Sequence, residues 1–223
     1  MSQSHVVVLD TETTGLDQSR DRVIEIGAIK LLDGRPVSKF HAYLNPQGVD
    51  SHPDALAVHG IANDFLLDKP TFEDIHAVFL EFVAGSDLVI HNAPFDVGFL
   101  DAELERVGYL SKISEICQVI DTLVLAKKQY PGQKNNLDAL CRRFGISISH
   151  RSLHGALLDA DLLVKVYLQM CVDQSDLLQM SVGASLSGEN TTSSFQAWDA
   201  PIDVIEASQA ECLAHDDFLE SIQ

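Results

Sequence analysis

The sequence has few basic residues and no long apolar run. Lysine and arginine together number 15 against 33 aspartates and glutamates, so the formal net charge is −18. A protein this acidic cannot hold nucleic acid through a broad basic surface, because neutralisation of phosphates by Lys and Arg dominates non-specific affinity. No apolar stretch of about 18 residues or more occurs, and the N-terminus lacks a charged segment followed by an apolar one. We therefore expect a soluble, cytoplasmic protein.

Cysteine is also scarce. The four cysteines are Cys117, Cys141, Cys171 and Cys212, which lie far apart and include no Cys-x-x-Cys pair. This spacing argues against a zinc cluster and provides no disulfide framework. We interpret them as reduced thiols, most of them buried.

The length and composition predict one main domain and a tail. A chain of 223 residues with 46% hydrophobic content can bury one substantial core. From Ser181 to Ser194 the residues are mostly Ser, Gly, Thr and Asn without helical periodicity, as in flexible linkers. The acidic, amphipathic segment Val204–Ile222 could fold as a helix when a partner covers its apolar side. We place the domain in residues 1–175, a linker region in 176–200 and a partner-binding tail in 201–223.

The order of the expected strands and helices predicts an α/β fold. Strand-like runs at His5–Asp10, Arg22–Leu32 and Lys39–Leu44, joined by short turns, predict an antiparallel meander. Later strands are expected at 87–91 and 119–121, and helices near 72–83, from Pro94, over 122–129 and 136–144, and from about 153 to 171. This pattern predicts a central mixed β-sheet, antiparallel meander plus parallel strands, flanked by helices.

Carboxylates stand at the expected ends of strands. Asp10 and Glu12 lie two residues apart where the first strand ends, so strand alternation places both on one face. A bare Asp-x-Glu is usually solvated, but the context Asp-Thr-Glu-Thr-Thr-Gly after an apolar strand favours a divalent-cation site. Asp96 is expected in the first turn of a helix, where the helix dipole alone would also explain an acidic residue.

His154 and Asp159 stand near the start of the last expected helix. Five residues on a regular helix are about 140° apart. For both side chains to face one site, His154 must lie before the helix proper or in its frayed first turn, with Gly155 permitting the bend. The neighbouring carboxylates Asp101 and Asp161 are interpreted as parts of solvated helix faces.

Taken together, these residues favour metal-dependent chemistry on a phosphodiester. Carboxylates supply hard oxygen ligands for two divalent cations, Mg²⁺ or Mn²⁺. Two such ions stabilise the attacking and the leaving oxygen of an in-line phosphoryl displacement. An imidazole, with an ordinary pKa of about 6.5, can take the proton of the attacking water.

Three motifs carry a family resemblance. Asp10–Gly15 (DTETTG), His91–Asp96 (HNAPFD) and His154–Asp159 (HGALLD) resemble the exonuclease motifs of the DEDDh family, which has a ribonuclease-H-like fold. The resemblance spans roughly residues 5–170 and implies 3′-to-5′ hydrolysis with His154 as the general base. The implied metal ligands are Asp10, Glu12, Asp96 and Asp159. The implied substrate-binding residues are Asp10, Glu12, Thr13, Val58, His59 and Asp159.

Further segments resemble the family's proofreading members. These are Val58–Ile61, Asn135–Asp138 and Arg151–His154. The resemblance implies removal of mispaired 3′-terminal nucleotides from DNA. The implied partners are the DNA 3′ end, the alpha subunit of bacterial DNA polymerase III, a theta-like subunit and the sliding clamp. The tail from Val204 would bind the polymerase.

A short segment after the domain resembles a clamp-binding peptide. Its clamp-binding residues would be Gln174, Asp176, Leu177 and Leu178, with leucine at the last position where phenylalanine is commoner. The alternative is the end of a helix that trails into a linker.

Two other functions remain open. Exoribonucleases and oligoribonucleases of the family share the same motifs, so the five site residues alone do not identify DNA as the substrate. A non-catalytic adaptor joining polymerase and clamp would be expected to have lost a ligand or the histidine, and none of the five is missing.

Overall fold

A computed structural model describes residues 5–148 and 153–183 of the chain, with side chains as far as residue 171. The contacts divide the chain into two units, Met1–Val182 and Gly183–Gln223. The predicted linker from residue 184 and the predicted tail lie outside the described residues. Among the helices that are described, none combines the length and the apolar character needed to cross a membrane.

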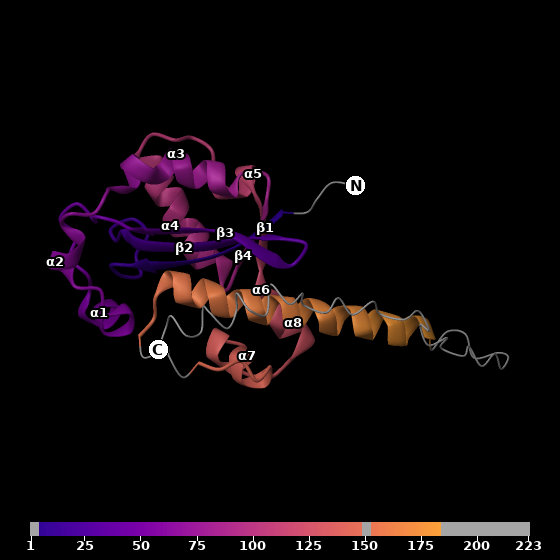
Figure 1. Ribbon diagram of the computed structural model, residues 1–223. Coiled ribbons are helices and arrows are strands. Elements are labelled where there is room, and N and C mark those ends of the chain that lie inside the picture. The colour runs from indigo at the N-terminus through magenta and orange to yellow at the C-terminus, as the bar shows by residue number, and fades with distance from the viewer. Residues whose placement is uncertain (1–4, 149–152, 184–223) are drawn as a thin grey trace, which may run out of the picture. The chain divides into compact units, whose positions relative to one another are not determined.

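The elements follow the predicted order (Figure 1). The strands are β1 (His5–Thr13), β2 (Val23–Leu32), β3 (Arg35–Tyr43), β4 (Asp87–Ile90) and β5 (Gln118–Asp121). The helices of the first half are α1 (Pro53–His59), α2 (Asn63–Leu66), α3 (Phe72–Val83) and α4 (Ala93–Arg106). Those of the second half are α5 (Ile113–Ile116), α6 (Thr122–Gln129), α7 (Leu137–Arg143) and α8 (Ala156–Gly183).

The five described strands form one mixed sheet in the order β3-β2-β1-β4-β5. The pairs β1–β2 and β2–β3 are antiparallel, as the short turns between these strands predict. The pairs β1–β4 and β4–β5 are parallel, because a helix separates each later strand from the one before it. The predicted meander followed by parallel strands is therefore confirmed.

Each face of the sheet is covered by a separate apolar core. Alternation along β1 sends Val7 and Leu9 into a core with α3 and α4, and Val8 into a core with α7 and α8. Figure 1 shows α3 and α8 on opposite sides of the sheet. Because both faces are buried, β2 and the first half of β1 (Val6–Leu9) are almost continuously apolar rather than alternating.

Local signals explain several of the helix boundaries. The side chain of Asn136 accepts from Ala139 N at the start of α7, and Asp121 accepts from the amides that open α6. The C-terminal end of α8 lies at Gly183, beyond the predicted end near Cys171. The extension follows from the composition, since no glycine or proline occurs between residues 171 and 183.

The cysteines agree in part with their interpretation. Cys117, Cys141 and Cys171 are free thiols, of which the first two are buried and the third is exposed. Burial raises the pKa of the Cys117 thiol to about 11, which keeps it protonated and unreactive. Cys212 lies outside the described residues.

Candidate active site

The C-terminal half of β1 presents side chains to both layers of the fold. Asp10 and Glu12 follow Val8 in the alternation, so they belong to the face that α8 covers. Thr11 belongs to the opposite face, where its side chain meets α4. The single strand end therefore connects the two helices that carry the other predicted site residues.

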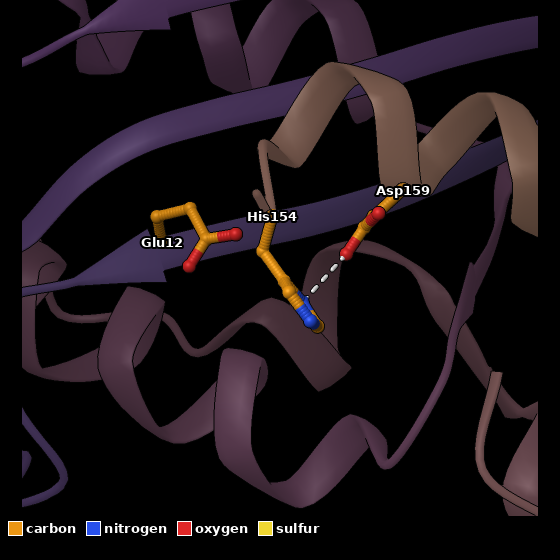
Figure 2. Close-up of side chains that lie close together, drawn as sticks. All are labelled: Glu12, His154 and Asp159. Carbon is orange, nitrogen blue, oxygen red and sulfur yellow. Dashed lines mark ion pairs between the residues drawn. The ribbon is translucent and has the colours of Figure 1, made fainter. Parts of the chain in front are cut away.

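Glu12, His154 and Asp159 converge. One ligand atom from each of these side chains lies within 4.8 Å of the other two, an arrangement that can hold a metal ion. His154 Nδ1 is 3.2 Å from Asp159 Oδ2, the contact drawn as a dashed line in Figure 2. The Asp159 side chain is buried, whereas that of His154 is 45% exposed. The imidazole can therefore meet a substrate from solvent while a buried carboxylate holds its inner nitrogen.

His154 precedes the helix, which is one of the two positions that the angular argument allows. α8 begins at Ala156, and the amide of His154 donates to Val58 O at 3.0 Å, so the backbone there is tied to the end of α1. Asp159 N donates to Gly155 O at 2.9 Å, which places Asp159 in the first turn. The two residues thus reach one site from different backbone conformations.

Gly27 allows α8 to approach the sheet at this point. A Cβ atom on Gly27 would lie 2.2 to 2.4 Å from backbone atoms of Ala156 and Leu157. Because such a contact is impossible, only glycine permits the helix to begin directly over β2. Gly27 is also the cross-strand partner of Asp10.

Asp96 lies in the first turn of α4 and is buried. Its Oδ1 accepts from Thr11 N at 3.0 Å and from Thr11 Oγ1 at 2.7 Å. Burial raises the pKa of Asp96 to about 7, although the two Thr11 bonds act to lower it. Asp96 is therefore fixed against β1 at Thr11, the residue between Asp10 and Glu12. In the absence of a cation it keeps its proton to near neutral pH.

The turn that leads into α4 has an unusual backbone. Asn92, the residue before the helix, has φ 67° and ψ 48°, a left-handed conformation that asparagine tolerates better than most residues. Its amide donates to Asp121 Oδ1 at 3.2 Å. This turn directs the first turn of α4, and with it Asp96, toward β1.

Three of the predicted substrate-binding residues lie beside this site. Val58 is exposed and lines a pocket of about 460 Å³ together with Gly15, Leu16, Asp17, Asp21, His52, Asp54 and Ala55. His59 is buried, its Nδ1 accepts from Ile61 N at 3.0 Å, and burial lowers its pKa. Its Nε2 has no hydrogen-bond partner among the described residues. Thr13 is also buried and its hydroxyl donates to Gly15 O at 2.6 Å.

The structure places the remaining predicted residues as follows. Asp10 is on the same face of β1 as Glu12. The cluster of ligand atoms formed by Glu12, His154 and Asp159 includes neither Asp10 nor Asp96. Gln174, Asp176, Leu177 and Leu178 fall within α8, and their side chains lie outside the described residues. Asp161 pairs with Lys165 at 2.7 Å on the helix surface, as interpreted. Asp101 accepts from Ile113 N at 2.8 Å, so it anchors α5 and is not simply solvated.

The sequence reasoning missed two residues that hold the site. Thr11 was assigned no side-chain role, yet it makes both contacts to Asp96. Glu25 is buried in β2 and accepts from Ala156 N, the first amide of α8. A glutamate inside an apolar strand-like run (Val23–Leu32) was the available signal, because an acidic residue is seldom buried without partners.

Comparison with known proteins adds to this geometry. The family model described as "Exonuclease" matches residues 7–167. The chain is 42% identical over 226 residues to "DNA polymerase III subunit epsilon" of Salmonella typhimurium, covering 97% of this chain and 93% of the relative. It is 44% identical over 230 residues to the protein of the same name from Rickettsia felis, covering 100% and 98%.

A solved structure described as exonuclease X in complex with 5′ overhanging duplex DNA matches the fold with a TM-score of 0.59 and 25% identity. It covers 76% of this chain and 93% of the matched one. The mixed sheet with helices on both faces is thus the ribonuclease-H-like arrangement that the motifs imply.

Proposed function

The chain belongs to the exonuclease family and, within it, to the DNA polymerase III epsilon subunits, and on this basis we propose how its site removes 3′-terminal nucleotides. The convergence of Glu12, His154 and Asp159 carries the proposal. These three residues come from two of the three motifs, and the third motif reaches β1 through the Asp96–Thr11 contacts.

His154 acts as the general base. With Nδ1 beside the buried Asp159 carboxylate, a proton on that nitrogen is held there, and Nε2 is left to accept the proton of an attacking water. The half-exposed position of the ring suits this role, because the water and the phosphodiester must both reach it. General-base catalysis of this kind contributes typically about 10² to 10⁴ in rate.

Four carboxylates hold divalent cations, for which Mg²⁺ or Mn²⁺ is the proposed identity. Asp10, Glu12, Asp96 and Asp159 are the ligands, an all-oxygen set that hard cations prefer. Burial of Asp159 beside Glu12, and of Asp96 against Thr11, fits this use, since a cation stabilises the charge of a buried carboxylate. When bound, such cations stabilise the charge that develops on the phosphate and its attacking and leaving oxygens.

The terminal nucleotide lies along the end of β1. The pocket that Val58 lines includes Gly15, the last residue of the first motif, and offers an apolar wall for a base or sugar. Thr13 and His59 are buried and adjoin residues of this wall, because the Thr13 hydroxyl donates to Gly15 O and His59 follows Val58 in α1. The unpartnered His59 Nε2 is a polar atom that a bound nucleotide could satisfy.

Because the chain is strongly acidic, it needs cations or partner proteins to bind DNA. With a net charge of −18, the protein relies on cations at the site and on partner proteins to bring it to a primer end. We propose the polymerase alpha subunit for the tail at 201–223 and the sliding clamp for the peptide within 174–178. A theta-like subunit is a further proposed partner. Residues 1–175 then form the catalytic domain, and 176–200 the remaining clamp-binding and linker region.

One digestion experiment tests the proposal. Purified protein with Mg²⁺ is given matched, 3′-mismatched and RNA-terminated primers, with and without EDTA, and the released products are analysed. We expect nucleoside monophosphates from the 3′ end of DNA, faster from the mismatch, and none with EDTA. Preferential digestion of the RNA terminus would instead support the exoribonuclease alternative. Loss of hydrolysis in the Asp159→Ala variant then connects the activity to this site.

A further inference from the structure

Glu25 is a buried carboxylate outside the motifs. It is the third residue of β2, is 2% exposed, and is the direct cross-strand partner of Glu12. Like charges directly opposite one another on a sheet are destabilising, so a glutamate here needs a compensating role. Its partners compensate it: Glu25 Oε1 lies 2.7 Å from His41 Nε2, Glu25 Oε2 accepts from Ala156 N at 3.1 Å, and the Tyr43 hydroxyl also hydrogen-bonds the carboxylate.

The contact with Ala156 N fixes the start of α8. The first amides of a helix have no partner within the helix, and a carboxylate that accepts from one of them also meets the positive end of the helix dipole. Ala156 is two residues after His154 and three before Asp159. Glu25 therefore holds the backbone from which both of these side chains reach the site.

The segment that carries His154 is held from two directions. On one side His154 N donates to Val58 O, and Leu153 packs so closely on Gly60 that a Cβ on Gly60 would lie 2.4 Å from its Cδ1. On the other side stands the Glu25–Ala156 bond. Without the second contact, the backbone of His154 keeps its bond to Val58 O, but the start of α8 loses its carboxylate acceptor.

We propose that Glu25 is a positioning residue for the hydrolytic reaction and acts by holding His154 in place through the N-terminus of α8. The inference rests on the proposed role of His154 as the base. Because Glu25 has no direct part in the chemistry, its loss should lower kcat and leave KM nearly unchanged. A displacement of about 1 Å at a reacting group can cost about 10² in rate, so the expected loss of kcat is about 10- to 100-fold.

The conservative variant distinguishes positioning from charge. In Glu25→Gln the carbonyl oxygen can still accept from Ala156 N, while the amide can donate to His41 Nε2 once the proton of that ring moves to Nδ1. Both contacts survive and only the charge is lost. We therefore expect Glu25→Gln to keep kcat within about 5-fold of wild type, whereas Glu25→Ala loses the bond and the rate together.

A double-mutant cycle with His154→Ala tests the proposed route of action. Single-turnover hydrolysis of a mismatched primer is measured with excess enzyme for the wild type, Glu25→Ala, His154→Ala and the double variant. If Glu25 acts through His154, then Glu25→Ala costs about 10- to 100-fold in the wild type and less than about 3-fold in His154→Ala. Should Glu25→Ala fail to fold, Glu25→Asp, which is too short to hold both partners, takes its place in the cycle.

Glu103→Ala is the matched control. Glu103 is also a fully buried carboxylate, but it accepts from Arg22, Val23 N and Arg106, away from α8. Its loss should lower thermal stability, and its effect on rate, if any, should be the same with and without His154. Equal effects of Glu25→Ala in both backgrounds, or a Glu25→Gln variant as slow as Glu25→Ala, would overturn the inference.

The outcome for the proposed function is read separately in the same experiment. A wild-type protein that hydrolyses no primer defeats the proposed function itself. If His154→Ala hydrolyses the primer at the wild-type rate, His154 is not the general base, and the positioning inference is overturned as well. A normal loss in His154→Ala with additive effects of Glu25 leaves the proposed function standing and overturns the inference alone.

Discussion

Replacing Asp96 by asparagine should stabilise the metal-free protein at neutral and alkaline pH while abolishing hydrolysis. Thr11 N and Thr11 Oγ1 both donate to one oxygen of Asp96, and an asparagine carbonyl can accept both bonds. Asp96→Asn therefore removes the ionisable oxygen and keeps the contacts that hold α4 to β1. Any change of stability then reports the ionisation of the carboxyl group itself.

The magnitude follows from the shift in pKa. Burial raises the pKa of Asp96 from 3.8 to about 7, and three pKa units correspond to about 4 kcal/mol. Because the native pKa is raised, the stabilisation that this carboxyl group contributes is fully present at low pH. It is lost as the pH rises from about 4 to about 7, and it changes little above that. Between pH 5 and pH 8 the wild type should lose about 2.5 kcal/mol relative to Asp96→Asn.

Urea denaturation followed by circular dichroism, in EDTA at pH 5 and pH 8, measures this difference. We expect the stability gap between Asp96→Asn and wild type to widen at pH 8, and Mn²⁺ to stabilise the wild type more than the variant. Asp101→Asn on the same helix serves as a control for activity, because Asp101 contacts Ile113 N and not β1. A gap that does not depend on pH would refute the assignment of Asp96 as a carboxyl held neutral by burial.

Four further outcomes are expected. His154→Ala should lose about 10² to 10⁴ in single-turnover rate while still binding a 3′ end, as measured by fluorescence anisotropy in Ca²⁺. Asp159→Ala should lose about 10³ or more, and its thermal midpoint in EDTA should not fall; activity within tenfold of wild type would exclude Asp159 as a ligand. Gly27→Ala should destabilise the fold by about 1 to 3 kcal/mol in urea, because its Cβ would overlap α8. A fragment of residues 1–183 should match the full chain on single-stranded oligonucleotides and lose co-elution with the polymerase alpha subunit; retained co-elution would place that contact on the catalytic domain.

The parts of the fold that were predictable have local signals. The three strands of the meander are marked by apolar runs and the short turns between them, and α6 has its predicted bounds because Asp121 caps it. The short helices α1, α2 and α5 were not predicted, since four to seven residues are too few for a helical period to appear. The predicted end of the last helix near Cys171 is wrong, because the sequence contains no glycine or proline between residues 171 and 183 that would end it.

The candidate site divides in the same way. The motifs predict that Glu12, His154 and Asp159 belong to one site, and helix geometry then limits His154 to a position before the helix or in its frayed first turn. The supporting contacts could not be predicted, because each joins residues far apart in the chain. Thr11 and Asp96 are separated by 85 positions, and Glu25 and Ala156 by 131. No local pattern contains such a pair.

The difference in length between two strands creates the place where the site forms. β1 pairs with β4 only as far as Val8, yet its pairing with β2 continues to Thr13. From Leu9 onward the β4-facing edge of β1 therefore has no partner among the described strands, and the amide of Thr11 is satisfied by Asp96 instead. If β4 extended two residues further, it would occupy that edge and the turn at Asn92 could not bring α4 against β1. The early end of β4 is thus as necessary to the site as the carboxylates, because it lets a helix side chain take the position of the next strand.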